Sequence, residues 1–376
     1  MQYSFRLAEL LGHIPDPKKR PGTVKAIVEY TGLDRHQVSA LLKNEVKYIP
    51  LKALSRLCDY LVEHGYANAD QLPGALFAVE SENFWEILAR RQRIEICCGI
   101  RRFHDDGDGP HGAWLVASDS LLMGELLNGI SSLGGTSKMN DSEPIPHPEL
   151  LQQSLVWSPS EEDQAEVFRR SAEVYDAFTQ FSSDRGLIGL GSVKSNPVVE
   201  HIMATTFGCE PFKEQSSVPA GVERSCPFML RYRDSDLKPE SCMAGTQLSK
   251  SELSQTPGIM YEKEDGTWDM VRWNEETEDA AMVFYIHREA LGRLEMVVGG
   301  FSGRATRMLA RTLASRGEDF WPPVYTGHGV QVGAFAIQFS FTTPKQKKHD
   351  ILLTEQPSNV KITPLDHHVI ARRLEK

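Results

Sequence analysis

The sequence predicts an α/β protein in two parts, a small all-α domain followed by a large α/β domain with a mainly parallel sheet. Short amphipathic helical segments fill the chain up to about residue 65. After residue 85, an apolar run, a small or polar loop and a helix follow one another three times, which is typical of strands alternating with helices. We therefore expect an all-α domain at 1–66, a connector at 67–84 and an α/β domain at 85–376.

Charge is distributed unevenly between these parts. Ten Lys/Arg and five Asp/Glu give residues 1–57 a formal charge of +5, whereas the whole chain carries −10, which leaves −15 for the remainder. A phosphate backbone attracts the first part and repels the second. If the protein binds nucleic acid, we expect only the N-terminal part to touch it.

Composition indicates a cytoplasmic protein. Hydrophobic residues make up 40% and charged residues 24% of the chain, and no apolar run is long enough to cross a membrane. The N-terminus lacks the basic-then-apolar order of a signal peptide. The six cysteines form no CxxC pair and no zinc-site spacing, so we expect reduced thiols and no metal.

The N-terminal segment predicts two helices joined by a sharp turn. Val24, Ile27 and Val28 recur at helical spacing. Gly32 allows the turn, and Asp34 is a good N-cap for the next helix. The buried stripe of that helix is Val38, Leu41 and Leu42, and a third helix with a leucine stripe runs to Gly65.

Residues 23–65 resemble the phage-repressor, Cro-like (XRE) helix-turn-helix family. The matching positions are Gly32, Leu33, Val38 and Leu41, and the departure is Val28, where the family usually has alanine. The resemblance implies a domain that binds double-stranded DNA. Its candidates for base edges are Arg35, His36, Gln37 and Ser39, and its candidates for the DNA backbone are Lys43 and Asn44. A helical corner that binds no DNA is the alternative.

Three strand-to-helix loops of the α/β part are rich in hydrogen-bond donors. They follow expected strands at 114–117, 187–190 and 294–298. Ligands of parallel sheets bind outside the carboxyl ends of the strands, so these loops form the predicted ligand site. The candidate residues are Ser118, Asp119, Gly191, Ser192, Lys194, Ser195, Asn196, Gly300, Ser302, Gly303, Arg304 and Thr306.

The chemistry of the loops favours a small anionic ligand. Free N–H groups at helix starts favour phosphate or carboxylate, and Lys194 and Arg304 add positive charge. Neither a Walker A motif nor a strict GxGxxG is present, so no cofactor is assigned, and a nucleotide or another phosphate-containing ligand is the expected class. This part is faintly similar to the Rossmann-like sensor modules of bacterial regulators and defence proteins.

The function predicted from these features is a sequence-specific transcriptional regulator, a homodimer whose α/β domain senses a ligand. Two alternatives stay open. In one, the α/β part is a nucleotide-processing hydrolase or glycosidase targeted by its head to nucleic acid, although no catalytic motif favours an enzyme. In the other, the α/β part is purely an interaction and dimerisation module. Polar residues expected near the strand ends, and read as structural, are Asp119, Asp184, Glu200, His201 and His287.

Two long segments of the α/β part lack the strand-and-helix pattern. Residues 134–165 are rich in Ser and Pro, and we expect them to form a surface excursion or lid. Residues 213–258 contain the strand-like run FMLRYR and predict a β-rich insertion. Two further strand-like runs near the end, VGAFAIQFSFTT and HDILLTEQ, predict an edge hairpin.

Overall fold

A computed structural model describes most of the chain and divides it into two compact units. The described residues are 3–11, 23–43, 45–67, 69, 72–73, 76–79, 81, 83–91, 93–102, 112–132, 151–160, 163–180, 185–213, 226–244, 256–327, 329–342 and 356–374. One unit, here called the head, comprises Met1–Glu82 together with the short segments Arg288–Gly292 and Thr326–Gln331. The remaining residues form the α/β unit.

The head is mainly helical. Its elements are β1 (Tyr3–Phe5), α1 (Leu7–Leu10), α2 (Thr23–Thr31), α3 (Arg35–Leu42), α4 (Leu51–Glu63), β2 (Phe77–Val79) and the 3-10 turn η6 (Glu289–Leu291). Strand β1 pairs antiparallel with β2, which the sequence had placed in the expected connector. The head therefore contains a two-stranded ribbon besides its predicted helices.

The head's core lies where α2, α3 and α4 meet. Ile27, Val38 and Leu57 are completely buried, and the cluster extends to Leu7 and Leu76 on the flanking segments. The predicted stripes of the helices are thus the faces that pack against one another. The larger Val28 is accommodated half-buried beside this cluster.

The α/β unit is built on one large sheet. Its helices are α5 (Phe84–Ala89), α6 (Ala117–Ser132), α7 (Gln164–Thr179), α8 (Val198–Phe207), α9 (Gly303–Arg316), η7 (Gly317–Phe320) and α10 (His367–Leu374). The strands of the sheet are β3 (Arg93–Arg102), β4 (Ala113–Leu115), β5 (Leu151–Trp157), β6 (Arg185–Leu190), β10 (Glu278–Arg288), β11 (Arg293–Gly300), β12 (Tyr325–Gly327), β13 (Val330–Ser340) and β14 (Asn359–Pro364).

The central strands of this sheet are parallel, as predicted. The order is β12-β13-β10-β11-β6-β3-β4, with β14 paired to β13 and β5 paired to β3. The pairs β11–β6, β6–β3 and β3–β5 are parallel, whereas β4 and β14 pair antiparallel with their neighbours. The short β4 lies in the region where a central strand was expected at 114–117.

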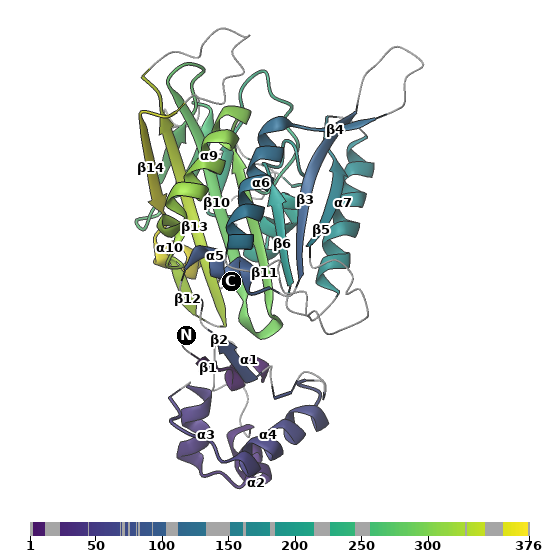
Figure 1. The fold of residues 1–376 in the computed structure, drawn as a ribbon, viewed down its shortest axis with the longest axis vertical. Helices are drawn as coiled ribbons and strands as arrows, with labels where there is room; N and C mark the ends of the chain where they lie inside the picture. The colour runs from purple at the N-terminus through teal and green to yellow at the C-terminus, as the bar shows by residue number, and fades with distance from the viewer. Residues whose placement is uncertain are drawn as a thin grey trace. The chain divides into compact units, whose positions relative to one another are not determined.

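Helices cover both faces of the sheet, and Figure 1 shows α6 and α9 side by side over one of them. On β6, Ile188 and Leu190 join the core under α6 and α9, while Gly189 faces Val199 of α8 on the other side. Helix α7 packs beside α8 on that second face. In the chain, α6 lies between β3 and β5, and α7 lies between β5 and β6. Because β5 and β6 both pair with β3, the strand order of the sheet reverses at β3.

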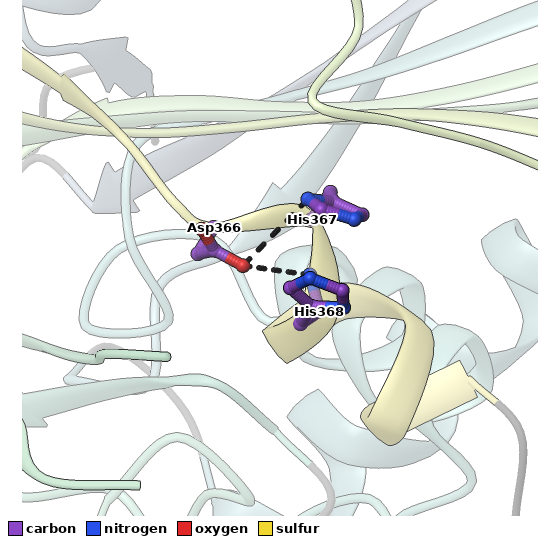
Figure 2. A group of neighbouring side chains, drawn as sticks. All are labelled: Asp366, His367 and His368. Atoms are coloured by element: carbon purple, nitrogen blue, oxygen red, sulfur yellow. Dashed lines mark hydrogen bonds and ion pairs between the residues drawn. The ribbon is translucent and has the colours of Figure 1, made fainter. Parts of the chain in front are cut away.

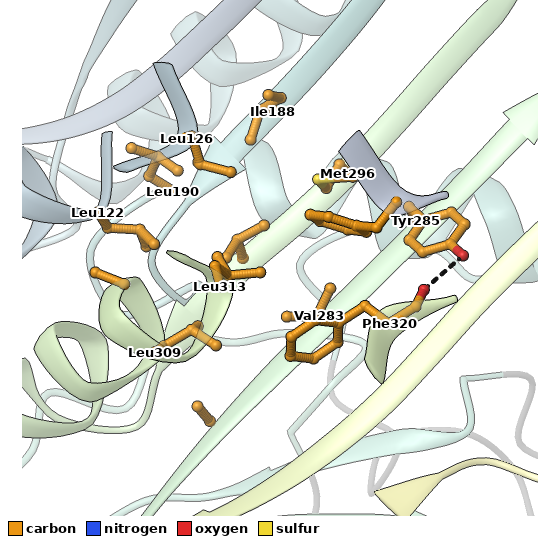
Figure 3. Close-up of a cluster of buried hydrophobic side chains, with 14 of the residues drawn as sticks. Leu122, Leu126, Ile188, Leu190, Val283, Tyr285, Met296, Leu309, Leu313 and Phe320 are labelled. Atoms are coloured by element: carbon orange, nitrogen blue, oxygen red, sulfur yellow. Dashed lines mark hydrogen bonds between the residues drawn. The ribbon is translucent and has the colours of Figure 1, made fainter. Parts of the chain in front are cut away.

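The main core lies between the sheet and the layer of α6 and α9. Figure 3 shows Leu122 and Leu126 of α6 meeting Leu309 and Leu313 of α9 above the sheet. Tyr285 is buried in this cluster, and its hydroxyl donates to the carbonyl of Phe320 at 3.0 Å. Burial of about 25 cal/mol per Å² of apolar surface makes this layer the main source of stability.

The regions expected to be irregular contain two sets of strands. The 213–258 region contributes to a three-stranded sheet of β7 (Phe228–Arg231), β8 (Gly258–Glu262) and β9 (Trp268–Arg272), in agreement with the predicted β-rich insertion. Within 134–165, however, β5 is a full strand of the large sheet, so the expectation of a surface excursion is wrong there. The first of the two expected C-terminal runs, VGAFAIQFSFTT, forms most of β13, which pairs with β14, a strand that the sequence analysis did not expect. Most of the second run, HDILLTEQ, lies outside the described residues.

Among the described helices, none has the length and apolar character that a membrane crossing requires.

Candidate functional site

The turn between α2 and α3 is fixed by three local features. Gly32 has φ +76°, a conformation that L side chains rarely adopt. Asp34 caps α3 by accepting from the backbone N–H of Gln37 at 2.8 Å. In return, the Gln37 side chain accepts from the backbone N–H of Asp34 at 3.1 Å, which completes a capping box. The start of α3 is therefore rigidly defined.

The polar residues predicted to read DNA occupy the outer side of α3. Arg35, His36 and Lys43 are exposed, and Gln37 and Ser39 are half-buried. Val38 and Leu41, between them in sequence, are buried in the head core. Gln37 also serves the capping box, a role that the sequence analysis missed although the Asp-x-x-Gln spacing is a known signal for it.

One predicted DNA contact, Asn44, lies outside the described residues. Lys43 ends the helix as its C-cap, and its backbone N–H donates to Leu41 and Ser39 carbonyls. The exposed row that the structure defines thus runs from Arg35 to Lys43.

Comparison with known families identifies this part of the chain. Residues 18–62 match the model of the Cro/C1-type HTH DNA-binding domain. The head carries a Cro/C1-type helix-turn-helix domain. The predicted family resemblance is confirmed, and α3 is the second helix of the helix-turn-helix. No curated protein and no solved structure matches the chain.

The predicted ligand loops after β6 and β11 come together, because these two strands are neighbours. Gly191 donates its N–H to the carbonyl of Val298 at 2.9 Å. A Cβ on Gly299 would lie 2.3 Å from the Gly191 oxygen, and one on Gly99 would lie 1.9 Å from the Ser195 oxygen. The loop at 191–196 is therefore packed directly onto both flanking strands.

Asn196 and Lys194 hold this loop in place. The buried Asn196 amide donates to the carbonyls of Cys97 (2.9 Å) and Leu190 (3.0 Å). Lys194 Nζ donates to the Phe301 carbonyl at 2.8 Å and pairs with Asp236 at 3.0 Å. Burial lowers the pKa of Lys194. The predicted anion-binding cation thus has internal partners from two other segments.

The serines of the 191–196 loop form hydrogen bonds within the loop itself. Ser195 Oγ donates to the Ser192 carbonyl at 3.2 Å. That carbonyl also accepts the backbone N–H groups of Ser195 and Asn196, both at 2.9 Å. These bonds close a compact turn that directs the chain into α8.

The start of α9 is capped from within the chain. Ser302 Oγ accepts from the backbone N–H groups of Arg304 and Ala305 and donates to the buried carboxyl of Asp279. Burial raises the pKa of Asp279 to about 6. Arg304 Nη1 donates to the Glu276 carbonyl at 2.9 Å, and its guanidinium stacks 3.4 Å from the centre of the Phe341 ring. Hydroxyl and carboxyl groups occupy the place where an anion was predicted.

The remaining ligand candidates of this end also have structural positions. A Cβ on Gly303 would lie 3.4 Å from Ser118 Oγ, which brings the starts of α6 and α9 together. Thr306 Oγ1 donates to the Ser302 carbonyl at 3.1 Å, and Gly300 packs against the same turn. Burial raises the pKa of Asp119, whose carboxylate accepts from Ser118.

The polar residues considered for catalysis are tied into the fold where the structure describes them. Glu200 is fully buried and accepts from Ser241 Oγ and from the backbone N–H of Cys242. Burial lowers the pKa of His201 to about 4. His287 contacts Arg91 at 3.0 Å, and Asp184 lies outside the described residues.

A cluster that the sequence analysis missed lies at the start of α10. Figure 2 shows Asp366 beside the rings of His367 and His368, whose potential metal ligands lie within 4.8 Å of one another. Asp366 Oδ1 accepts the backbone N–H of His368 at 2.8 Å, and both imidazoles are more than half exposed. The position of the Asp366 carboxylate is explained by its capping of α10. The two adjacent histidines were the signal in the sequence that could have pointed to this cluster.

Proposed function

We propose that the protein is a sequence-specific DNA-binding transcriptional regulator whose α/β unit senses a small anionic ligand. The observation that carries the proposal is the Cro/C1-type domain, with a capped recognition helix and an exposed polar row on it. DNA binding also favours a cytoplasmic location, in the compartment that holds the DNA of a cell without a nucleus.

In this proposal α3 enters the major groove with its N-terminal turn towards the bases. Arg35, His36, Gln37 and Ser39 then face base edges, and Lys43 and Asn44 face phosphates. Arg and Gln can each make paired hydrogen bonds to one base, which gives sequence preference. The charge split supports this orientation, since the rest of the chain is acidic and repels DNA.

A homodimer follows from the small footprint of one recognition helix. A single α3 reads only a short half-site, so specific binding requires two heads. We expect half-sites about 34 Å apart, or a multiple of that distance, on a pseudo-palindromic operator. A ligand regulates such a dimer only if it binds one of two arrangements of the heads more tightly.

The α/β unit supports a second candidate function. The predicted ligand residues at the strand ends stay a prediction, and Lys194 and Arg304 already have internal partners. These internal bonds favour the alternative in which the loops bind no ligand and the α/β unit is an interaction and dimerisation module. Binding of nucleotides, with loss of binding in Lys194→Met, would support the sensor at this position instead.

The DNA-binding proposal is tested with operators selected from random DNA by the full-length protein. We expect Arg35→Ala to lose about 1–3 kcal/mol of operator binding while random DNA is bound as before. Lys43→Ala is expected to weaken all DNA equally and to reduce the salt slope by about one. Lys25→Ala is the matched control, because Lys25 is exposed on α2 and, among the described residues, pairs with Glu29. Unchanged sequence preference in Arg35→Ala would contradict the assignment of α3.

A further inference from the structure

Three side chains that can bind a metal lie together where α10 begins. Asp366 precedes the helix, and His367 and His368 are its first two residues. One potential ligand atom of each lies within 4.8 Å of the other two, and His367 Nδ1 is 3.8 Å from Asp366 Oδ1. Figure 2 shows the carboxylate turned towards both histidines. Two imidazoles and a carboxylate are a donor set that binds divalent transition metals.

A fourth group approaches this cluster from a segment that is distant in the sequence. Glu264 lies in the turn between β8 and β9. Its Oε1 is 4.0 Å from Nε2 of His368. Carboxylates in this position hold the ring of a metal-binding histidine and make it a stronger ligand. The cluster therefore combines side chains of two elements and is not a single run of sequence.

The fold already holds these two segments against each other. Arg372 and Arg373, further along α10, donate to the two oxygens of Glu262 on β8 at 2.9 and 2.7 Å. Glu262 is only 3% exposed, so water screens these bonds little. Arg372 also donates to the backbone carbonyl of Glu264 at 3.3 Å. The β8–β9 turn and the start of α10 are thus positioned before any metal binds.

The ligand atoms can reach a metal with small movements. Asp366 Oδ1 accepts the backbone N–H of His368 at 2.8 Å, which leaves Oδ2 for a cation. Both histidine side chains are more than half exposed, so they can rotate without disturbing the core. Ligands about 2.0 Å from a tetrahedral zinc ion are about 3.3 Å from one another. Atoms that now lie within 4.8 Å need to approach by at most about 1.5 Å.

The local charge also permits a cation. The N-terminus of a helix carries about half a positive charge, which by itself opposes a metal ion. At the junction of α10 with the β8–β9 turn, however, four carboxylates stand against three basic side chains. These charged residues are Glu262, Lys263, Glu264, Asp265, Asp366, Arg372 and Arg373. The carboxylates of Asp366 and Glu264 are the ones beside the imidazoles, so negative charge prevails there.

We propose that Asp366, His367 and His368 bind a divalent transition metal ion of the Zn²⁺ type, with Glu264 as the carboxylate that holds His368. The ion fastens the start of α10 to the β8–β9 turn. Imidazole ligands disfavour Mg²⁺ and Ca²⁺, which bind oxygen. The site differs from the expectation of no metal, which rested on the spacing of the cysteines. It goes beyond the proposed function and does not depend on it, because all four residues lie in the α/β unit.

The test titrates Zn²⁺ into the reduced full-length protein by isothermal titration calorimetry, after removal of metals with EDTA. Mg²⁺ is the reference ion. We expect one bound equivalent of Zn²⁺ to disappear in the double variant His367→Ala/His368→Ala. Zinc held by thiols elsewhere is present in both proteins and does not affect the difference. Because both rings are exposed and Asp366 still caps α10, the variant should unfold in urea as the wild type does when EDTA is present.

Two single variants sharpen the assignment. Glu264→Gln keeps the size of the side chain and removes its charge, so Zn²⁺ should bind about 10–100-fold more weakly. His64→Gln is the matched control, because this exposed histidine ends α4 in the head and should leave the affinity unchanged. In the wild type, Zn²⁺ should also raise the unfolding temperature in a saturable way.

Each outcome decides for or against the site. Loss of one Zn²⁺ equivalent in the double variant, with the control unchanged, supports it. The site is overturned if the double variant binds as much Zn²⁺ as the wild type, if Mg²⁺ gives the same response, or if His64→Gln loses the equivalent instead. Full affinity in Glu264→Gln would remove Glu264 from the site.

Discussion

Gln37 has two roles that one pair of substitutions can separate. Its side-chain oxygen completes the capping box with the backbone N–H of Asp34, and its position on α3 predicts contact with a base. Gln37→Ala removes both. Gln37→Glu keeps the oxygen acceptor, and a negative charge in the first turn also favours the helix dipole. The glutamate, however, cannot donate hydrogen bonds to a base edge.

The expected magnitudes follow from this geometry. The capping bond is 3.1 Å long and exposed, so its loss in Gln37→Ala should cost about 0.5 kcal/mol of head stability. Loss of a paired base contact should cost about 1–3 kcal/mol of discrimination between operator and random DNA. We therefore expect Gln37→Glu to retain head stability and yet lose roughly tenfold or more in operator preference.

Two measurements check these values. The head contains no tryptophan, so its stability is read from amide hydrogen exchange of α3. Operator and random DNA are compared by fluorescence anisotropy at one salt concentration. If Gln37→Glu keeps the full operator preference, Gln37 only caps the helix and the base-reading assignment must be withdrawn.

Two further predictions concern the α/β unit, both read by urea unfolding with tryptophan fluorescence. Burial raises the pKa of Asp279 from 3.8 to about 6, so the folded state holds a proton that the unfolded chain has released. The free energy of unfolding should fall by about 3 kcal/mol as the pH rises from 3.8 to about 6 and then level off. Asp279→Asn should abolish this pH dependence. If the variant keeps the same pH dependence, other groups cause it. Gly99→Ala should cost about 3 kcal/mol, because the new Cβ would collide with the backbone oxygen of Ser195. Gly124→Ala is the control, because a Cβ at this position of α6 would meet no atom within 4 Å, and it should be neutral or stabilise by up to about 1 kcal/mol. Equal effects of the two substitutions would show that the backbone at Ser195 moves to make room for the new Cβ.

The features that could be predicted from the sequence are those fixed by local pattern. The turn at Gly32 and the stripe of Val38 and Leu41 are set within a few residues, and the structure and the family match confirm them. The strands before Gly191 and Gly299 were also recognisable, because buried parallel strands are continuous apolar runs.

The features that were missed depend on pairing between distant segments. Strand β5 carries Gln152, Gln153 and Ser154 and pairs only with β3 among the described strands, so its pattern lacks the apolar run of a central strand. Glu264 and His368 lie far apart in the sequence, and the docking of α10 on β8 brings them together. No local pattern contains that information.

The carboxyl ends of the strands show why donor-rich loops are weak evidence for an anion site. At the carboxyl ends, Lys194 is already bonded to Asp236 and to the Phe301 carbonyl, and Ser302 uses its oxygen to cap α9. A ligand there would have to displace these bonds, which costs about as much as it gains. The number of donors in a loop is therefore a weak signal for a site of this kind, because the fold itself can use every donor.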